Sequence, residues 1–184
     1  MNSSKSRRRD VLKAGLALGL ASSVPAQENP AASRPKEGDF LVKTNDTTAT
    51  PLTPADIRAG RKQVMAWAMD PNDKTVRSGS RLNRIILIHL DPASLSAETK
   101  PRAAEGIVAF SAICTHAGCE VAEWVPEKQL LFCPCHESTF NPADGAKVID
   151  GPAVKMLPAL PIGIADGKLV VLKPFATPIT FETQ

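Results

Sequence analysis

The chain has 184 residues and a formal net charge of +3 at pH 7. Residues 1–26 hold five of the 22 Lys and Arg residues and one of the 19 Asp and Glu residues, which leaves 17 basic and 18 acidic residues, a charge of −1, in the rest. That balance excludes the strongly basic surface of a nucleic-acid-binding protein. The length suits one ordinary domain, and sixteen Pro with only six Phe, two Trp and no Tyr indicate aliphatic packing and many turns.

Residues 1–26 are typical of a twin-arginine export signal. Arg7-Arg8-Arg9 precede an apolar run from Ala14 to Leu20, and Val24-Pro25-Ala26 is a small-x-Ala cleavage site. The apolar stretch from Ala14 to Val24 is about half of the ~20 residues that a membrane-spanning helix needs, so we expect cleavage after Ala26. The mature protein is then expected in the periplasm, either soluble or bound to a membrane complex.

Residues 27–58 are predicted to be a linker and N-terminal extension that becomes ordered near Asp39, because no apolar period appears before Phe40. Residues 59–184 are predicted to form one domain of short strands. The expected strands are residues 64–69, 85–90, 107–113, 121–124, 130–132, 159–164 and 169–172, with Asp166-Gly167 as the turn of the last hairpin. Short strands at such intervals predict an all-β barrel or sandwich.

All four cysteines and two of the three histidines lie between residues 114 and 136. They form two boxes, Cys114-Thr115-His116 and Cys133-Pro134-Cys135-His136, with sixteen residues between His116 and Cys133. Two thiolates and two imidazoles are ligands for an iron–sulfur cluster. A structural zinc site uses the same ligand types and stays an alternative, although it leaves two cysteines without a role.

Together with Gly118, Pro134 and Ser138, the two boxes resemble those of the Rieske [2Fe-2S] proteins. The resemblance implies the Rieske fold, in which antiparallel sheets carry a small inserted cluster-binding subdomain, here at about residues 112–153. It also implies one [2Fe-2S] cluster, whose histidine ligands raise the potential to roughly −150 to +300 mV. The implied ligands are Cys114 and Cys133 on the inner iron and His116 and His136 on the outer iron.

The resemblance assigns roles to several neighbouring residues. It implies a disulfide between Cys119 and Cys135, which requires an oxidising compartment. It implies that the Ser138 hydroxyl donates a hydrogen bond to a bridging sulfide and so raises the potential. It also implies that Gly151 and Pro152 belong to a third loop that shields the cluster from water.

Two positions depart from the family pattern. Phe140 stands where the family places a tyrosine hydroxyl that donates to a ligand sulfur, and Glu137 stands where relatives often carry glycine. A phenyl ring has no donor, and a carboxylate beside a ligand disfavours an added electron. Both changes predict a potential below that of the high-potential quinol-oxidising members. His89, alone in an apolar run, is interpreted as structural.

The function that the resemblance implies is an exported one-electron carrier of the quinol:cytochrome c reductase type, a subunit rather than a stand-alone enzyme. Its partners would be a c-type cytochrome and cytochrome b or another oxidoreductase subunit. Quinol would contact His136, and electron uptake would be coupled to protonation at the ligating histidines. A second hypothesis is the small Rieske subunit of a periplasmic oxidoreductase similar to arsenite oxidase, which fits the short signal and the missing tyrosine. A zinc-stabilised binding module is the third.

Overall fold

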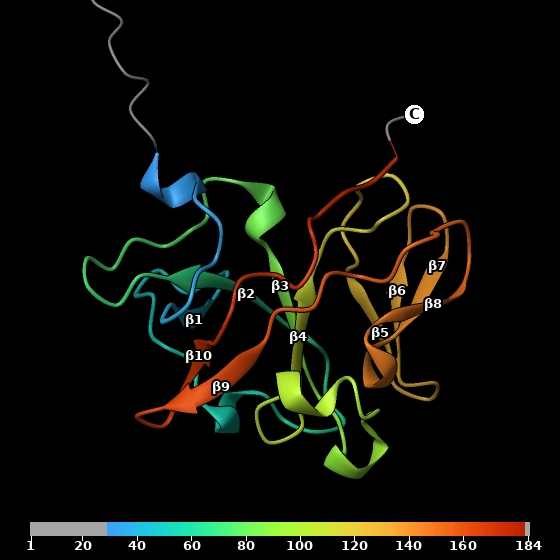
Figure 1. Cartoon of the computed structure of the whole chain (residues 1–184), viewed down its shortest axis with the longest axis horizontal. Helices are drawn as coiled ribbons and strands as arrows, with labels where there is room; N and C mark the ends of the chain where they lie inside the picture. Colours follow the sequence, from blue (N-terminus) through green and yellow to red (C-terminus); the bar gives the residue numbers. More distant parts are fainter. Residues whose placement is uncertain (1–28, 183–184) are drawn as a thin grey trace, which may run out of the picture.

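Ten strands form two antiparallel sheets in residues 29–182, the part of the chain that the computed structural model describes (Figure 1). The export signal predicted for residues 1–26 lies outside these residues. The strands are β1 (Phe40–Lys43), β2 (Val64–Met69), β3 (Ile85–His89), β4 (Ile107–Ser111), β5 (Glu123–Val125), β6 (Leu130–Cys133), β7 (Ser138–Asn141), β8 (Lys147–Asp150), β9 (Ile162–Ala165) and β10 (Lys168–Val171). The helices are single 3-10 turns, namely η1 (Pro30–Ala32), η2 (Pro54–Asp56), η3 (Arg81–Asn83), η4 (Pro92–Ser94), η5 (Lys100–Arg102) and η6 (Pro142–Asp144). The all-β prediction is confirmed.

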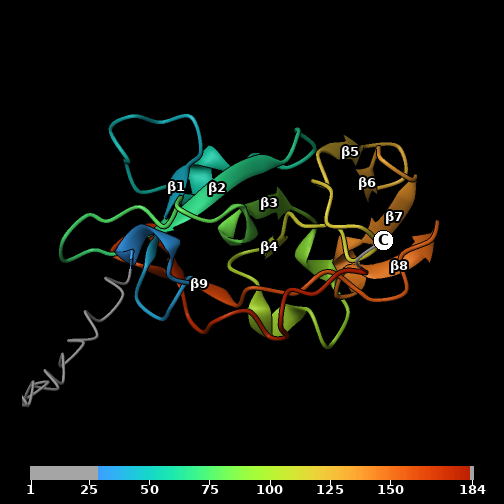
Figure 2. The same ribbon diagram turned by 90° about the horizontal axis from the view of Figure 1, so that it is seen from above.

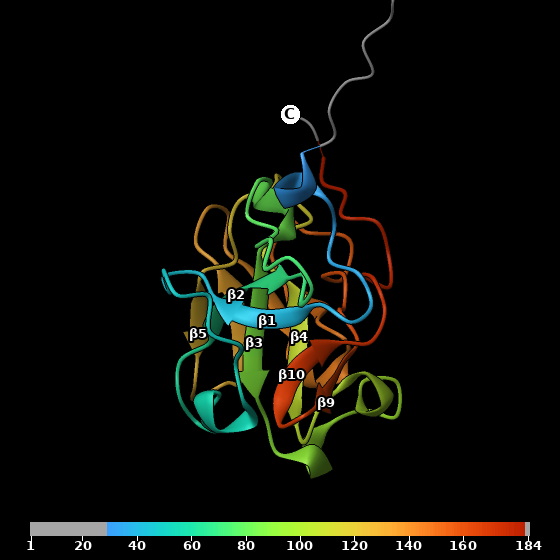
Figure 3. The same cartoon turned by 90° about the vertical axis from the view of Figure 1, so that its left-hand side faces the viewer.

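The larger sheet has six strands in the order β4-β3-β2-β1-β10-β9 (Figure 3). Strands β3 and β4, at one end of this order, are the apolar runs that were predicted to be strands, and both of their faces are buried. Ile85 and Leu87 point into one core cluster, whereas Ile86 and Ile88 point into a second cluster that includes Leu131 of the smaller sheet. Because successive side chains of a strand point to opposite faces, an uninterrupted apolar run is what two-sided burial requires.

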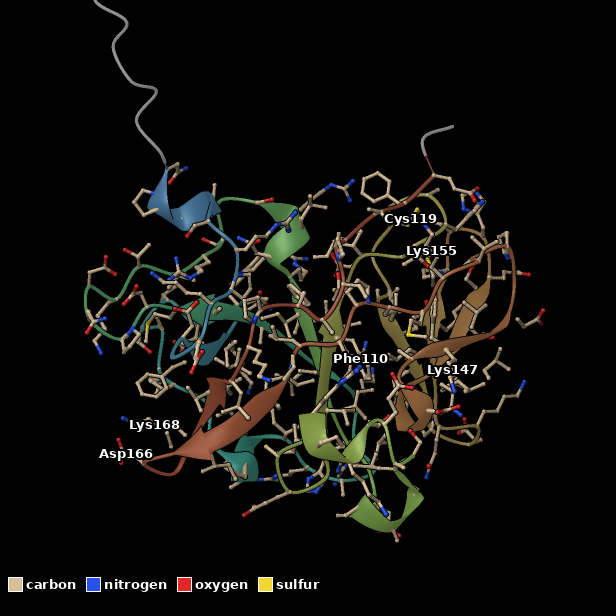
Figure 4. All side chains as sticks on the ribbon, viewed as in Figure 1. Phe110, Cys119, Lys147, Lys155, Asp166 and Lys168 are labelled. Carbon is tan, nitrogen blue, oxygen red and sulfur yellow. A yellow bond between two sulfur atoms is a disulfide. The ribbon has the colours of Figure 1, made fainter. Side chains whose placement is uncertain are left out.

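The smaller sheet has the order β5-β6-β7-β8 and is inserted between β4 and β9 (Figure 2). The predicted strand at residues 121–124 begins two residues later, at Glu123, because the Val121 N–H donates to the carbonyl of Ala112 instead of joining β6. Strands β7 and β8 were not predicted, since their sequences Ser-Thr-Phe-Asn and Lys-Val-Ile-Asp are short and largely polar. Phe110 of β4 lies between the two sheets (Figure 4).

Residues 29–58 pack into the domain, and the part after Asp39, where order was expected to begin, includes a strand. β1 lies inside the larger sheet, where Leu41 faces Ala68 of β2 and Phe40 faces Val170 of β10. Leu41, Leu52 and Ile57 are buried. These apolar residues are separated by polar turns and show no period, so only the pairing with β2 and β10 makes them part of the core.

A buried arginine fastens this N-terminal segment to the sheet. Arg77 donates to Asp39 Oδ1 at 2.8 Å and to Asp70 Oδ2 at 3.2 Å, and it also donates to the hydroxyl of Ser33. The hydrogen bonds from the guanidinium to Asp39 stabilise its charged form and raise the pKa of Arg77. Removing one partner would leave a buried charge unpaired, so this cluster fixes where the segment before β1 lies.

Candidate metal centre

Two loops that are distant in sequence meet at one end of the smaller sheet. The first loop, residues 114–119, follows β4 and closes with a hydrogen bond from the Cys114 N–H to the Cys119 carbonyl at 2.8 Å. The second loop, residues 133–138, joins β6 to β7, whose ends pair at Cys133 and Ser138. A disulfide between Cys119 and Cys135, with the Cα atoms 6.5 Å apart, ties the loops together. The structure thus contains the expected disulfide pairing (Figure 4, where Cys119 is labelled).

The four predicted ligands lie in these loops at two depths. Cys114 and Cys133 are free thiols with exposed fractions of 2% and 1%. His116 is partly exposed and His136 is exposed, and their ring centroids are 4.7 Å apart with the rings nearly perpendicular. The thiols therefore form an inner pair and the imidazoles an outer pair. This arrangement provides two thiolates for one iron and two imidazoles for the other.

Two properties of these side chains fit a metal cluster. The Nδ1 atom of His116 is buried and has no hydrogen-bond partner within residues 29–182. A buried polar atom without a partner is costly, and a metal bond would satisfy it. Burial, together with the neighbouring Cys114 thiol, raises the pKa of Cys133 to about 11. A thiolate at this depth therefore needs a metal cation to offset the cost of its charge.

The ligand candidates form two like pairs, one of thiols and one of imidazoles. Among the described residues, no three His, Cys, Asp or Glu side chains are grouped as the ligands of one metal ion. A structural zinc ion requires four ligands at the corners of one tetrahedron. A [2Fe-2S] cluster of the Rieske type requires a thiolate pair and an imidazole pair on two different irons, which is the grouping observed.

A third segment, residues 151–155, closes over the two loops. Gly151 has φ +87°, and a Cβ atom there would come within 2.5 Å of the Ser138 Cα, so only glycine allows this approach. The Ala153 N–H donates to the buried Ser138 hydroxyl at 3.1 Å. The Thr115 hydroxyl donates to the carbonyl of Lys155, which connects this segment to the first loop as well. The predicted third loop is therefore in contact with both ligand loops.

The two departures from the family pattern occupy different environments. Phe140 is fully buried in the same apolar cluster as Cys114 and Cys133. Glu137 is exposed beside His136 and has φ +62°, a left-handed conformation that side chains other than glycine adopt at a cost. A glycine at this position would adopt that conformation without strain.

The C-terminal residues reach the centre although sequence reasoning did not include them. The Glu182 N–H donates to the carbonyl of His116 at 2.7 Å, and Phe181 packs on Gly118. No local motif marked them, because the contact depends on how the chain returns after β10. His89, by contrast, lies away from the ligand loops, and its Nδ1 atom is 2.7 Å from the carbonyl of Ile57. Within residues 29–182, no helix is long and apolar enough to cross a bilayer.

Comparison with known proteins agrees with this centre. Residues 91–161 match the family model described as "Rieske [2Fe-2S] domain". The chain is 38% identical over 146 residues to the cytochrome bc1 complex Rieske iron-sulfur subunit of Streptomyces lividans, covering 78% of this chain and 85% of that protein. It is equally similar to the Streptomyces coelicolor subunit, of which it covers 41%. A putative respiratory nitrate reductase subunit Rieske of Haloferax mediterranei is 38% identical over 96 residues, 52% of this chain and 43% of that protein.

The similar solved structures share little sequence with this chain. The cyanobacterial plasma membrane Rieske protein of Synechocystis is 24% identical with a TM-score of 0.42, covering 65% of this chain and 93% of that chain. The family model and the Streptomyces lividans relative span the two ligand loops, where the thiol pair and the imidazole pair meet. The chain belongs to the Rieske [2Fe-2S] iron-sulfur protein family and has one [2Fe-2S] cluster as its cofactor.

Proposed function

We propose that this chain is the exported Rieske electron-transfer subunit of a cytochrome bc1-type quinol:cytochrome c reductase. The observation that carries the proposal is the pairing of two buried thiols with two outward imidazoles, in a chain similar to bc1 subunits over most of its length. Its partners would then be cytochrome b and a c-type cytochrome. A [2Fe-2S] cluster supplies reversible transfer of one electron at this site.

The loop residues have distinct proposed roles. Cys114 and Cys133 bind the inner iron, where burial keeps water from the thiolates. His116 binds the outer iron through its buried Nδ1 atom, and His136 binds beside it. The exposure of His136 makes it the residue that would contact quinol. The outward ring nitrogens of both histidines would gain a proton when an electron is taken up.

The Ser138 hydroxyl is proposed to stabilise the reduced state. One of its lone pairs accepts the Ala153 N–H, so its own proton remains available for another acceptor. Donation to a bridging sulfide would stabilise the negative charge that an electron adds. Gly151 and Pro152 place the third loop against the second and would shield the cluster from water.

A second candidate is a Rieske subunit of a different periplasmic oxidoreductase, such as an enzyme similar to arsenite oxidase. It is favoured by Phe140, which lacks the tyrosine donor. The Haloferax mediterranei relative, named as a subunit of a putative respiratory nitrate reductase, also favours it.

The deciding experiment is purification of the native protein from its host in mild detergent, with haem spectra and metal analysis of what co-purifies. Haems of the b and c types with quinol-dependent cytochrome c reduction support the bc1 assignment, and a molybdenum subunit supports the second candidate. Ligation is tested by electron paramagnetic resonance (EPR) of reduced His136→Asn, which should lose the Rieske signal. The matched control His89→Asn should keep it.

Export is tested by replacing Arg7, Arg8 and Arg9 with Lys, which keeps the charge of the segment. If the twin arginines direct export, the variant accumulates in the cytoplasm, whereas the unchanged chain is found in the periplasmic or membrane fraction. Equal distribution of the two chains would contradict the signal that the sequence predicts.

A further inference from the structure

The C-terminal segment, residues 176–182, crosses from the base of the domain to the first ligand loop. In Figure 1 it is the red trace that rises to the upper right and ends beside the yellow loop. At its start, the Ala176 N–H donates to the carbonyl of Ala159 at 2.8 Å. At its end, the Glu182 N–H donates to the carbonyl of His116 at 2.7 Å. The segment is therefore attached at both ends to different parts of the molecule.

Between these attachments the segment and the third loop line the same groove. An open groove of about 590 Å³ separates Thr177 and Thr180 from Lys155 and Met156. Beyond the groove, Phe181 and Glu182 contact the first loop directly.

Phe181 adds a packing contact to the backbone hydrogen bond. Its ring covers Gly118, where a Cβ atom would come within 2.9 Å of the ring. Arg81 of η3 also lies near this contact, with its guanidinium 5.5 Å from the Phe181 ring centroid. Arg81 also donates to the carbonyl of Gly118. Residues 116–118 are thus held between the base of the domain and the C-terminal segment.

The hydrogen bond from Glu182 falls on a residue of the first loop that lies between the other attachments. Cys114 follows β4, Thr115 is bonded to Lys155, and Cys119 is in the disulfide. His116 lies between these points, and the Glu182 N–H donates to the backbone carbonyl of His116. An error of about 1 Å in the position of a functional group is enough to disturb its chemistry, so a support at this residue matters.

We propose that residues 176–182 form a C-terminal strap that positions His116 in the metal centre. Phe181, Arg81 and the N–H group of Glu182 act as positioning groups, because they hold the loop backbone without contacting the imidazole. The inference rests on the proposed role of His116 as a ligand. It predicts that the centre depends on a backbone N–H near the end of the chain rather than on the Glu182 side chain.

The test compares Glu182→Pro with Glu182→Ala in the full-length, cluster-containing protein. Both variants lose the carboxylate, but only proline removes the N–H group. Hydrogen exchange of the peptides that contain residues 115–119 should be about fivefold faster in Glu182→Pro, the factor expected for one lost hydrogen bond. The EPR signal of the reduced protein should broaden in Glu182→Pro and stay unchanged in Glu182→Ala.

A second pair tests the packing contact. Phe181→Ala should accelerate the same exchange and broaden the same signal, and Phe181→Leu, which restores apolar contact with Gly118, should recover most of the difference. If all four variants had the exchange rates and the spectra of the unchanged protein, the proposal of a positioning strap would be refuted. If the unchanged protein gave no Rieske signal, the proposed function would fail, and the exchange rates would still decide whether the strap holds the loop.

Discussion

A hydroxyl group added at Phe140 is expected to raise the midpoint potential by about 40 mV. Phe140 is fully buried with Cys114 and Cys133, so a phenol in Phe140→Tyr would have ligand sulfurs rather than water as acceptors. Reduction adds negative charge to the centre and strengthens such a bond. If the bond gains ~1 kcal/mol on reduction, the potential rises by about 40 mV, because 59 mV corresponds to 1.4 kcal/mol for one electron.

Stability provides an independent measure of whether the bond forms. A buried hydroxyl without a partner costs about 1–3 kcal/mol of unfolding free energy, whereas a satisfied one costs little. Potentials would be measured by redox titration followed by EPR, and stability by guanidinium unfolding of the oxidised protein. Phe132→Tyr is the matched control, since Phe132 is partly exposed on the neighbouring strand β6 and should shift neither quantity.

An unchanged or lower potential in Phe140→Tyr, with the cluster intact, would refute this reasoning. It would mean that the hydroxyl does not reach a ligand sulfur, and a loss of about 1–3 kcal/mol in stability would accompany it. A potential of the unchanged protein at the top of the Rieske range, near +300 mV, would contradict the importance assigned to the missing tyrosine.

Three further predictions concern other parts of the molecule. Replacing both Cys119 and Cys135 with Ser should lower the unfolding free energy by ~3 kcal/mol, because the disulfide closes a loop with a sequence separation of 16; a loss below about 1 kcal/mol in chemical unfolding would contradict it. Glu137→Gly and Glu137→Gln should raise the potential equally, because both remove the same charge. Only glycine relieves the strain of the left-handed conformation, so Glu137→Gly should be more stable than Glu137→Gln by about 0.5 kcal/mol. In thermal melts, Asp70→Asn should flatten the dependence of stability on acid pH. Hydrogen bonds, led by the Asn72 N–H and followed by Lys36, lower the pKa of Asp70 from 3.8 to about 2. The contribution of Asp70 to stability is therefore complete above about pH 4 and is lost as the pH falls towards 2. An unchanged acid profile would exclude Asp70.

The ligand set could be predicted from the sequence because each box is local. Cys114 and His116 are two residues apart, and Cys133 and His136 are three residues apart, so each short loop presents its own pair whatever the rest of the chain does. The strands β3 and β4 were equally accessible to prediction, since burial on both faces requires a continuous apolar run. The predicted disulfide and the third loop followed from the family resemblance, and the structure places both at the ligand loops.

The remaining features depend on contacts between segments that are far apart in the chain. Nothing near Leu41 indicates that β1 lies between β2 and β10, because its apolar neighbours become a core only when those strands pair. The polar strand β7 is likewise a strand because β6 and β8 supply its hydrogen bonds.

The same distinction between local sequence and long-range contacts applies to the metal centre. The sequence alone was enough to predict which side chains would bind the cluster, because ligand identity and spacing are properties of short segments. The tertiary structure decided which atoms are buried, how the two histidine rings lie, and that Phe181 and Glu182 support the loop of His116. Those properties arise from packing, in which residues 66 positions apart, such as His116 and Glu182, meet only after the whole domain has folded.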